Sequence, residues 1–200
     1  LNEKVIEPET EFRDLPKNIT CGGRPIREYD NKIPSNLTAE QILIRSGNIG
    51  SVRIAQKIGI EKFKSFLDNI GVLNKIEFDI EEVGQPIQFR WGKCKLATSS
   101  YGHGITTTPL QLAKGYSIIT NGGYDIKPTL IKKNNRENTK KRILNKGVSE
   151  KINLILRKIV STKEGTANFA NIPGYEVGGK TGTAQKSING VYSKSKVNTF

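Results

Sequence analysis

Residues 174–186 read GYEVGGKTGTAQK, a strand pattern that four glycines interrupt. A glycine inside a strand often marks the close approach of another backbone or of a ligand. Alternate residues of a strand face opposite sides of it. Within Lys180–Thr183 the lysine and the glycine therefore share one side, and the two threonines share the other. An ammonium group flanked by hydroxyls suits a carboxylate, and the stretch therefore predicts an edge that binds an anionic substrate. A glycine-rich edge strand without a ligand explains the same residues, and this alternative stays open.

The tripeptide Ser46-Gly47-Asn48 follows a predicted helix. Thr38 followed by Gln41 matches a capping box, so the helix begins after Thr38 and ends near residues 45–47. The tripeptide then lies in a tight turn. Serine and asparagine at helix ends usually only satisfy backbone groups, and a second S-x-N occurs at residues 187–189. By itself the tripeptide is a weak indication of a functional site.

The rest of the chain alternates helical patterns with irregular segments. We expect helices over residues 50–58, 61–70, 109–121 and 150–161, with Ser149 capping the last, and a short strand over residues 127–133. The apolar residues of the helix that begins at Pro109 are spread over much of its circumference, so we expect this helix to be mostly buried. Residues 72–107 show no clear period and are predicted to form a long loop, which is typical of functional segments. A turn near Asn189-Gly190 leads into an antiparallel partner strand.

The chain is strongly basic, with 32 Lys and Arg against 19 Asp and Glu and a formal net charge of +13. Such a charge favours polyanions, such as nucleic acid or anionic lipid, without choosing among them. No apolar run approaches the ~18 residues that a membrane span needs, and no signal-peptide pattern begins the chain. The single histidine, His103, excludes a His-rich metal site, and we assign it no catalytic role.

The two cysteines, Cys21 and Cys94, match neither C-x-x-C nor zinc-finger spacing, which excludes a disulfide scaffold and a zinc finger. We expect both thiols to stay unpaired, although an oxidising compartment would permit one disulfide. The chain contains no methionine and begins at Leu1, so we expect it to be a piece of a longer protein.

The S-x-N turn and the K-T-G strand, whose first residues lie 134 positions apart, resemble two of the three motifs of penicillin-recognising serine enzymes. Residues 99–123 (SSYGHGITTTPLQLAKGYSIITNGG) and 165–186 look like the transpeptidase domain of class B penicillin-binding proteins. The similarity extends from about Arg24 onward, and S-G-N is more like the septal, cell-division type. It implies an α/β serine transpeptidase fold, an antiparallel sheet flanked by helices, of which residues 1–200 form an incomplete part lacking the final strands.

The resemblance also implies an activity. Such enzymes acylate a serine with the penultimate D-alanine of a peptidoglycan stem peptide and release the last D-alanine, and an amine of a neighbouring strand then resolves the acyl-enzyme into a cross-link. In this reading Ser46 relays a proton toward the leaving amine, and Asn48 hydrogen-bonds the catalytic lysine and the substrate amide. Lys180 keeps the site electropositive and orients the Ser46 hydroxyl.

Substrate binding is assigned to the K-T-G strand in the same way. Thr181 and Thr183 hold the carboxylate of the stem peptide or of a β-lactam, Gly182 lets the substrate lie against the strand, and the Thr183 N–H forms half of the oxyanion hole. The nucleophile motif, S-x-x-K, does not occur before the S-x-N. Its one match, residues 193–196, is expected in a turn between strands, so we treat it as chance. We therefore expect the nucleophile upstream and this piece alone to be inactive.

The partners and location also come from the resemblance. It implies binding of peptidoglycan stem peptides and β-lactams, contacts with membrane proteins of the division apparatus, an inner-membrane anchor outside this segment and a periplasmic catalytic domain, with no metal or organic cofactor. A β-lactam-binding sensor or a β-lactamase-like hydrolase is the alternative. A basic nucleic-acid-binding module is a remote one, since clustered arginines and aromatic platforms are missing.

Overall fold

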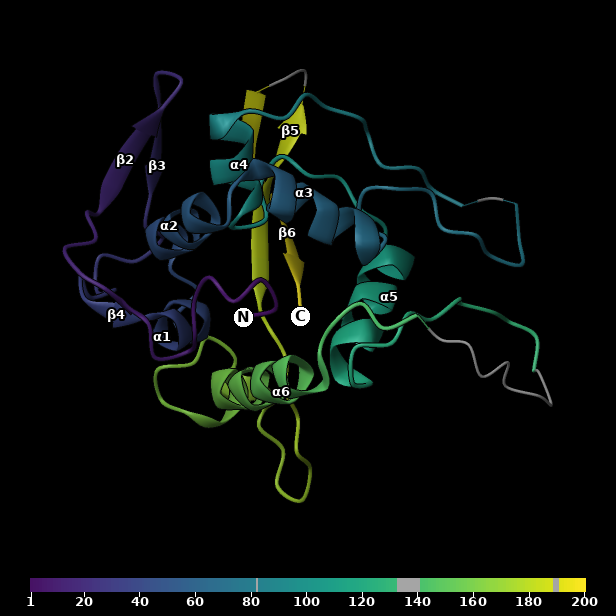
Figure 1. Ribbon diagram of the computed structural model, residues 1–200. Helices are drawn as coiled ribbons and strands as arrows, with labels where there is room; N and C mark the ends of the chain where they lie inside the picture. The colour runs from purple at the N-terminus through teal and green to yellow at the C-terminus, as the bar shows by residue number, and fades with distance from the viewer. Residues whose placement is uncertain (82, 133–140, 189–190) are drawn as a thin grey trace.

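The computed structural model describes residues 1–81, 83–132, 141–188 and 191–200 (Figure 1). The elements in chain order are β1 (Glu11–Phe12), β2 (Asn18–Cys21), β3 (Arg24–Arg27), β4 (Leu37–Thr38), α1 (Ala39–Ile44), α2 (Asn48–Ile58), α3 (Ile60–Asn69), α4 (Lys93–Ser99), α5 (Pro109–Thr120), α6 (Lys146–Ser161), the 3₁₀ helix η1 (Asn168–Ala170), β5 (Gly182–Ile188) and β6 (Val191–Thr199). Within the described residues, no helix has the length and apolarity needed to cross a bilayer.

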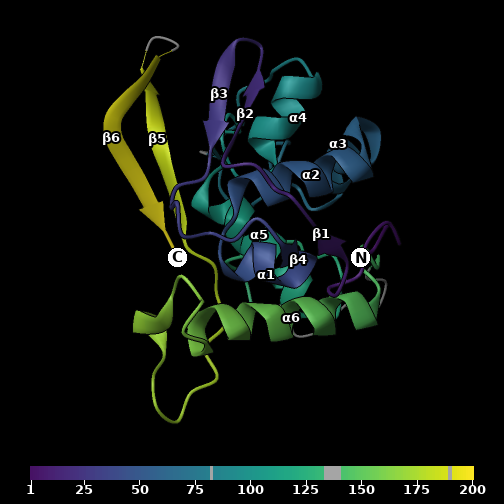
Figure 2. The same cartoon turned by 90° about the vertical axis from the view of Figure 1, so that its left-hand side faces the viewer.

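The strands of the described chain pair as three antiparallel two-stranded ladders, β1 with β4, β2 with β3 and β5 with β6. Figure 2 shows the β5–β6 hairpin along one side of the helices, with α6 crossing below α1 and α5. This arrangement confirms the expected mixed α/β class, with helices beside antiparallel strands. The partner strand expected at the C-terminal end is also confirmed, because β6 pairs with β5. The turn expected at residues 189–190 lies outside the described residues.

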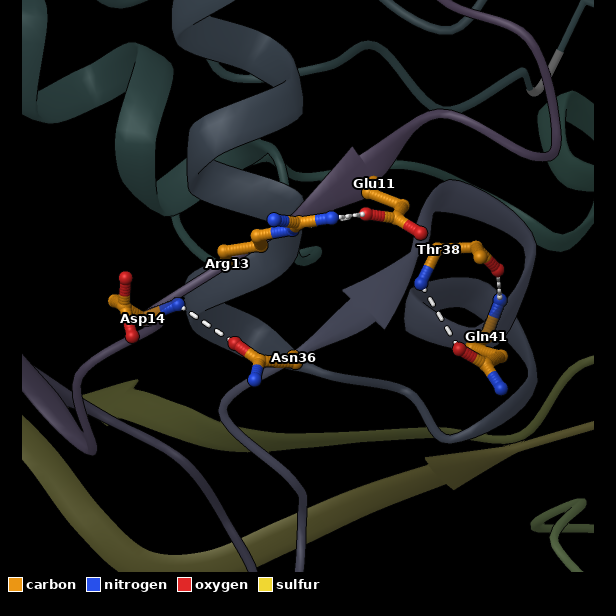
Figure 3. Close-up of polar contacts among 6 residues, drawn as sticks. All are labelled: Glu11, Arg13, Asp14, Asn36, Thr38 and Gln41. Atoms are coloured by element: carbon orange, nitrogen blue, oxygen red, sulfur yellow. Dashed lines mark hydrogen bonds and ion pairs between the residues drawn. The ribbon is translucent and has the colours of Figure 1, made fainter.

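The helix before the S-x-N tripeptide begins as its capping residues predict. The Thr38 side chain accepts a hydrogen bond from the Gln41 N–H, and the Gln41 side chain accepts one from the Thr38 N–H (Figure 3). A second capping box joins Thr108 and Gln111 at the start of α5, where Pro109 occupies the first helical position. Each box satisfies N–H groups that a helix terminus otherwise leaves without partners. These local signals confirm where α1 and α5 begin.

Apolar packing joins α1 to both α2 and α6. Ile42 of α1 and Ile49 of α2 are almost fully buried in one cluster with the N-terminal strands. Ile44, on another side of α1, packs with Ile155 and Ile159 of α6 in a second cluster. Burying an isoleucine side chain contributes about 1.5–3 kcal/mol. The short helix α1, which carries the S-x-N turn at its end, is therefore held by packing on two sides.

The structure corrects the expectations for two segments of irregular pattern. The predicted loop over residues 72–107 contains the helix α4, whose Leu96 and Ala97 are buried. Its apolar stretch is too short to show a helical period in the sequence. The strand predicted over residues 127–133 does not form in its described part, because the Leu130 N–H and the Thr129 hydroxyl both bond to the Asp79 carboxylate at 2.6 Å instead of to a partner strand.

The expectations for two helices are also corrected. α6 begins at Lys146, one turn before the predicted cap, because the Ser149 hydroxyl is buried and donates to the Ile119 carbonyl rather than capping the helix. α5 is less buried than expected, with Leu112 and Tyr116 exposed by 37% and 39%. The polar Gln111 is as fully buried as Ile118, and its amide donates to the Asn74 carbonyl at 2.6 Å.

The cysteine expectation was wrong, because Cys21 and Cys94 form a disulfide across 73 sequence positions. The bond ties the β2–β3 hairpin to α4. Two cysteines this far apart in the chain give no local sign of pairing, and only the packing of α4 against β2 brings their sulfur atoms together.

Candidate active site

The S-x-N tripeptide forms a strained turn between α1 and α2. Ser46 has a φ of 57°, in the left-handed region that a residue with a Cβ rarely adopts. On its N-terminal side the turn is closed by hydrogen bonds from the Ser46 N–H to the Leu43 carbonyl at 3.2 Å and from the Gly47 N–H to the Ile42 carbonyl at 2.9 Å. A conformation of this kind costs about 1–3 kcal/mol and persists only where its surroundings impose it. Such strain is common at functional sites, which makes the Ser46 side chain a candidate.

Lys180 reaches this turn from the other end of the chain. Its Nζ donates to the Ser46 Oγ at 2.7 Å and to the Thr181 carbonyl at 2.8 Å. Burial lowers the pKa of Lys180 from 10.5 to about 8. The lysine is therefore still largely protonated at neutral pH, yet its pKa lies close enough to neutrality for proton transfer to cost little.

The Asn48 side chain is directed to the other side of the turn. Its Nδ2 donates to the Arg27 carbonyl at 2.9 Å, at the end of β3. The Asn48 N–H and the Ile49 N–H both donate to the Glu28 carboxylate, at 2.7 and 3.0 Å. Asn48 thus lies beside Ser46 and begins α2, while one side of its amide is engaged by the backbone at the end of β3.

The K-T-G strand is shorter than its sequence pattern predicts, because β5 begins only at Gly182. Lys180 and Thr181 therefore precede the strand, and the expected alternation of side chains between its two faces begins only at Gly182. The Thr181 hydroxyl shares a hydrogen bond of 2.6 Å with the Thr166 hydroxyl, in the segment after α6. Thr183 is exposed and pairs with Asn198 across the β5–β6 ladder.

Two glycines beside Lys180 make room for the end of β6. A Cβ added to Gly182 would lie 2.4 Å from the Thr199 hydroxyl, and one added to Gly179 would lie 2.5 Å from the Phe200 ring. Both contacts are to the ends of side chains, so a Cβ at either position would require Thr199 or Phe200 to shift.

Two further contacts near the turn have no signal in the sequence. The Arg45 guanidinium forms an ion pair with the Glu164 carboxylate at 2.7 Å, which ties the residue before Ser46 to the segment after α6. The Tyr29 hydroxyl donates to the Arg45 carbonyl at 3.0 Å. Residues from two distant segments thus hold Arg45, the residue directly before Ser46.

A mostly apolar cavity of about 450 Å³ opens beside Lys180. Its lining comes from the N-terminal segment and from helices on several sides, and includes Ala39, Ile54, Phe63, Ile119, Ile155 and Lys180. Ser46 is not part of the lining. Lys180 therefore lines the cavity and also contacts Ser46 of the S-x-N turn.

The other sequence matches lie elsewhere. Residues 193–196, the S-x-x-K match, lie within the strand β6 rather than in the expected turn between strands, and they do not begin a helix. Ser187 of the second S-x-N belongs to β5, and Asn189 lies outside the described residues. The His103 ring packs on the Tyr101 ring with centroids 4.9 Å apart. Among the described residues, no three His, Cys, Asp or Glu side chains gather into a group that could hold a metal ion.

Comparison with known proteins gives one consistent result. Residues 1–200 match the family model described as penicillin binding protein transpeptidase domain. The chain is 30% identical over 177 residues to the probable peptidoglycan D,D-transpeptidase FtsI of Caulobacter vibrioides, covering 86% of this chain and 30% of the relative. It is 32% identical over 166 residues to the stage V sporulation protein D of Bacillus subtilis, covering 76% of this chain and 25% of the relative. The chain thus spans well under half the length of these two relatives.

Solved structures agree with the sequence relatives. The transpeptidase domain of penicillin-binding protein 3 from Burkholderia pseudomallei matches with a TM-score of 0.87 at 26% identity, over 96% of this chain and 58% of that one. Penicillin-binding protein 3 from Mycobacterium tuberculosis matches with a TM-score of 0.85 at 22% identity, over 96% of this chain and 47% of that one, which supports the fold.

Proposed function

Because the chain belongs to the penicillin-binding protein transpeptidase family, we propose that it is part of a serine-type D,D-transpeptidase that cross-links peptidoglycan during septal cell-wall synthesis. Relatives named peptidoglycan D,D-transpeptidase FtsI and PenA support this activity and the septal role. One observation carries the proposal: the 2.7 Å hydrogen bond from Lys180 Nζ to Ser46 Oγ, which joins the K-T-G and S-x-N motifs across 134 positions.

The reaction begins when a serine hydroxyl attacks the carbonyl carbon of the penultimate D-alanine and gives its proton to the catalytic lysine of the nucleophile motif. The carbonyl electrons move onto the oxygen, and when they return the peptide bond breaks and the last D-alanine leaves as an amine that must gain a proton. Ser46 relays this proton: its hydroxyl, oriented by the hydrogen bond from Lys180, passes its own proton to the leaving amine and takes one from the catalytic lysine. The ammonium group of Lys180 holds that hydroxyl in one orientation.

Lys180 also supplies the electrostatics of substrate binding. As a half-buried cation that contacts neutral oxygen atoms of Ser46 and Thr181, it attracts the carboxylate of the stem peptide or of a β-lactam. Thr181 and Thr183 bind this carboxylate with their hydroxyls, and Gly182 keeps the strand open to the substrate. The Thr183 N–H donates to the developing oxyanion, a contact worth about 3–4 kcal/mol of barrier. Asn48 completes the site by binding the substrate amide and the catalytic lysine.

The nucleophile and its lysine come from a segment that this sequence does not contain. The S-x-x-K match within β6 begins no helix, and the chain covers only 30% of its FtsI relative. Residues 1–200 are then one part of the transpeptidase domain. An inner-membrane anchor outside this segment, a periplasmic catalytic domain and partners from the division apparatus complete the proposal.

Labelling of the intact protein with fluorescent penicillin tests the proposed function. We expect a stable covalent adduct on a serine outside residues 1–200, and an acylation rate at least tenfold lower in Lys180→Ala, because that variant loses the cation and the hold on Ser46. Slow loss of the adduct distinguishes a transpeptidase from a β-lactamase-like hydrolase. An intact protein that takes up no label, or that is labelled on Ser193, would contradict the proposal.

A further inference from the structure

Glu28, the residue that follows β3, caps the helix α2. One oxygen of its carboxylate, Oε2, accepts the Asn48 N–H at 2.7 Å, and the other, Oε1, accepts the Ile49 N–H at 3.0 Å. The helix needs this cap from elsewhere because Gly47, which precedes it, has no side chain that could bond to the first N–H groups. A carboxylate at a helix N-terminus gains from charge-assisted hydrogen bonds and from the helix dipole.

The two N–H groups that Glu28 binds lie immediately after the strained residue. Ser46 is held in its left-handed conformation on the N-terminal side by the bond from the Gly47 N–H to the Ile42 carbonyl at 2.9 Å. On the C-terminal side the hold comes from Glu28 and from the bond of Asn48 Nδ2 to the Arg27 carbonyl at 2.9 Å. The end of β3 thus clamps the start of α2.

Loss of this clamp has a defined consequence. A serine relaxes from the left-handed region when its surroundings allow it, because its Cβ is crowded there. Rotation of the Ser46 backbone would move Oγ away from Lys180, with which it makes a hydrogen bond of 2.7 Å. The apolar anchors of α1 and α2, Ile42 and Ile49, would stay buried, so the fold would persist while the turn loosened.

We propose that Glu28 is a positioning residue for Ser46, an inference that rests on the proposed transpeptidase function. By binding the first two N–H groups of α2, Glu28 keeps the Ser46 hydroxyl within reach of Lys180 and of the leaving amine. Glu28 itself touches no substrate and transfers no proton.

Saturation kinetics of acylation by fluorescent penicillin, on the intact enzyme, test this role. In Glu28→Gln the charge and one acceptor oxygen are lost, and we expect the first-order acylation constant to fall about tenfold. The dissociation constant of the initial non-covalent complex should stay unchanged, because the K-T-G residues are not affected and the Asn48 side chain keeps its own bond to the Arg27 carbonyl. Glu28→Asp, whose shorter carboxylate reaches fewer N–H groups, should show a smaller fall.

A double variant and a matched control separate positioning from general stability. In a Ser46→Ala background, Glu28→Gln should change the acylation constant by less than about twofold, since the group that it positions is absent. Thr108→Val removes a comparable helix cap, at the start of α5, and should destabilise the enzyme without slowing acylation.

The outcomes are distinguishable. If the wild-type enzyme takes up label and Glu28→Gln acylates at the wild-type rate, the positioning role is refuted while the proposed function stands. The same conclusion follows if Thr108→Val slows acylation as much, or if Glu28→Gln acts equally in the Ser46→Ala background. If the wild-type enzyme takes up no label, the proposed function itself fails.

Discussion

Replacing Ser46 by glycine and by alanine separates the effect of its backbone from the effect of its hydroxyl. At a φ of 57°, a residue with a Cβ costs about 1–2 kcal/mol relative to glycine. Glycine also gives the unfolded chain more freedom, which offsets about 0.4–1 kcal/mol of that gain. Both variants lose the hydrogen bond with Lys180 equally. We therefore expect Ser46→Gly to be more stable than Ser46→Ala by roughly 1 kcal/mol.

Urea denaturation of the intact protein measures this difference, and fluorescent penicillin measures acylation in the same samples. Both variants should lose acylation to a similar extent, because each lacks the hydroxyl, although glycine relieves the strain. Asp14, with a φ of 53°, offers a matched control away from the site. Asp14→Gly should exceed Asp14→Ala in stability by a similar amount, with acylation unchanged.

Two results would contradict this prediction. If Ser46→Ala is as stable as Ser46→Gly while the Asp14 pair differs as expected, Ser46 is not strained by its backbone. If Ser46→Gly acylates at the wild-type rate, the hydroxyl has no part in the reaction.

Three further predictions concern charge, covalent linkage and packing. The acylation rate should fall as pH rises through about 8, because Lys180 is protonated below its pKa and loses its charge above it. An acylation rate that does not decrease above pH 8 would contradict the role of its ammonium group. Reduction of the disulfide between Cys21 and Cys94 should lower the free energy of unfolding by about 2–4 kcal/mol. Urea denaturation with and without reductant measures this change. The stability of a Cys21→Ser/Cys94→Ser variant should not respond to the reductant. Gly50→Ala should lower the free energy of unfolding of the protein by about 1–3 kcal/mol, since the added Cβ would lie 2.5 Å from an α1 side chain. Gly147→Ala, in open space in α6, should instead raise it by up to about 1 kcal/mol. Thermal melts measure both variants, and equal effects would mean that α1 and α2 are not closely packed.

Local patterns predicted the helices best where side chains bond to the backbone within one turn. Thr38 and Thr108 identified the starts of α1 and α5, because a capping box joins residues only three positions apart. The start of α6 was misplaced for the opposite reason. Ser149 looks like a cap in the sequence, yet its hydroxyl bonds to the Ile119 carbonyl thirty positions away.

The candidate site was predicted in part. The motif residues Ser46 and Lys180 lie together, as the family resemblance led us to expect. The residues that hold them, Glu28, Arg45 and Glu164, were missed, since each acts through a partner in a distant segment. A carboxylate that caps an N–H group twenty positions away produces no local or periodic sequence pattern from which the contact could be predicted.

The family, the class of fold and the ammonium and hydroxyl groups of the candidate site could thus be read from the amino-acid sequence, because the residues of a motif or of a helix cap lie within a few positions of one another. That an ammonium group meets a strained serine, that two cysteines pair and that Glu28 completes a helix terminus follows only from the folded arrangement. These contacts depend on how the buried faces of α1, α2 and α6 dock. That docking is set by the burial of apolar surface contributed by residues far apart in the chain.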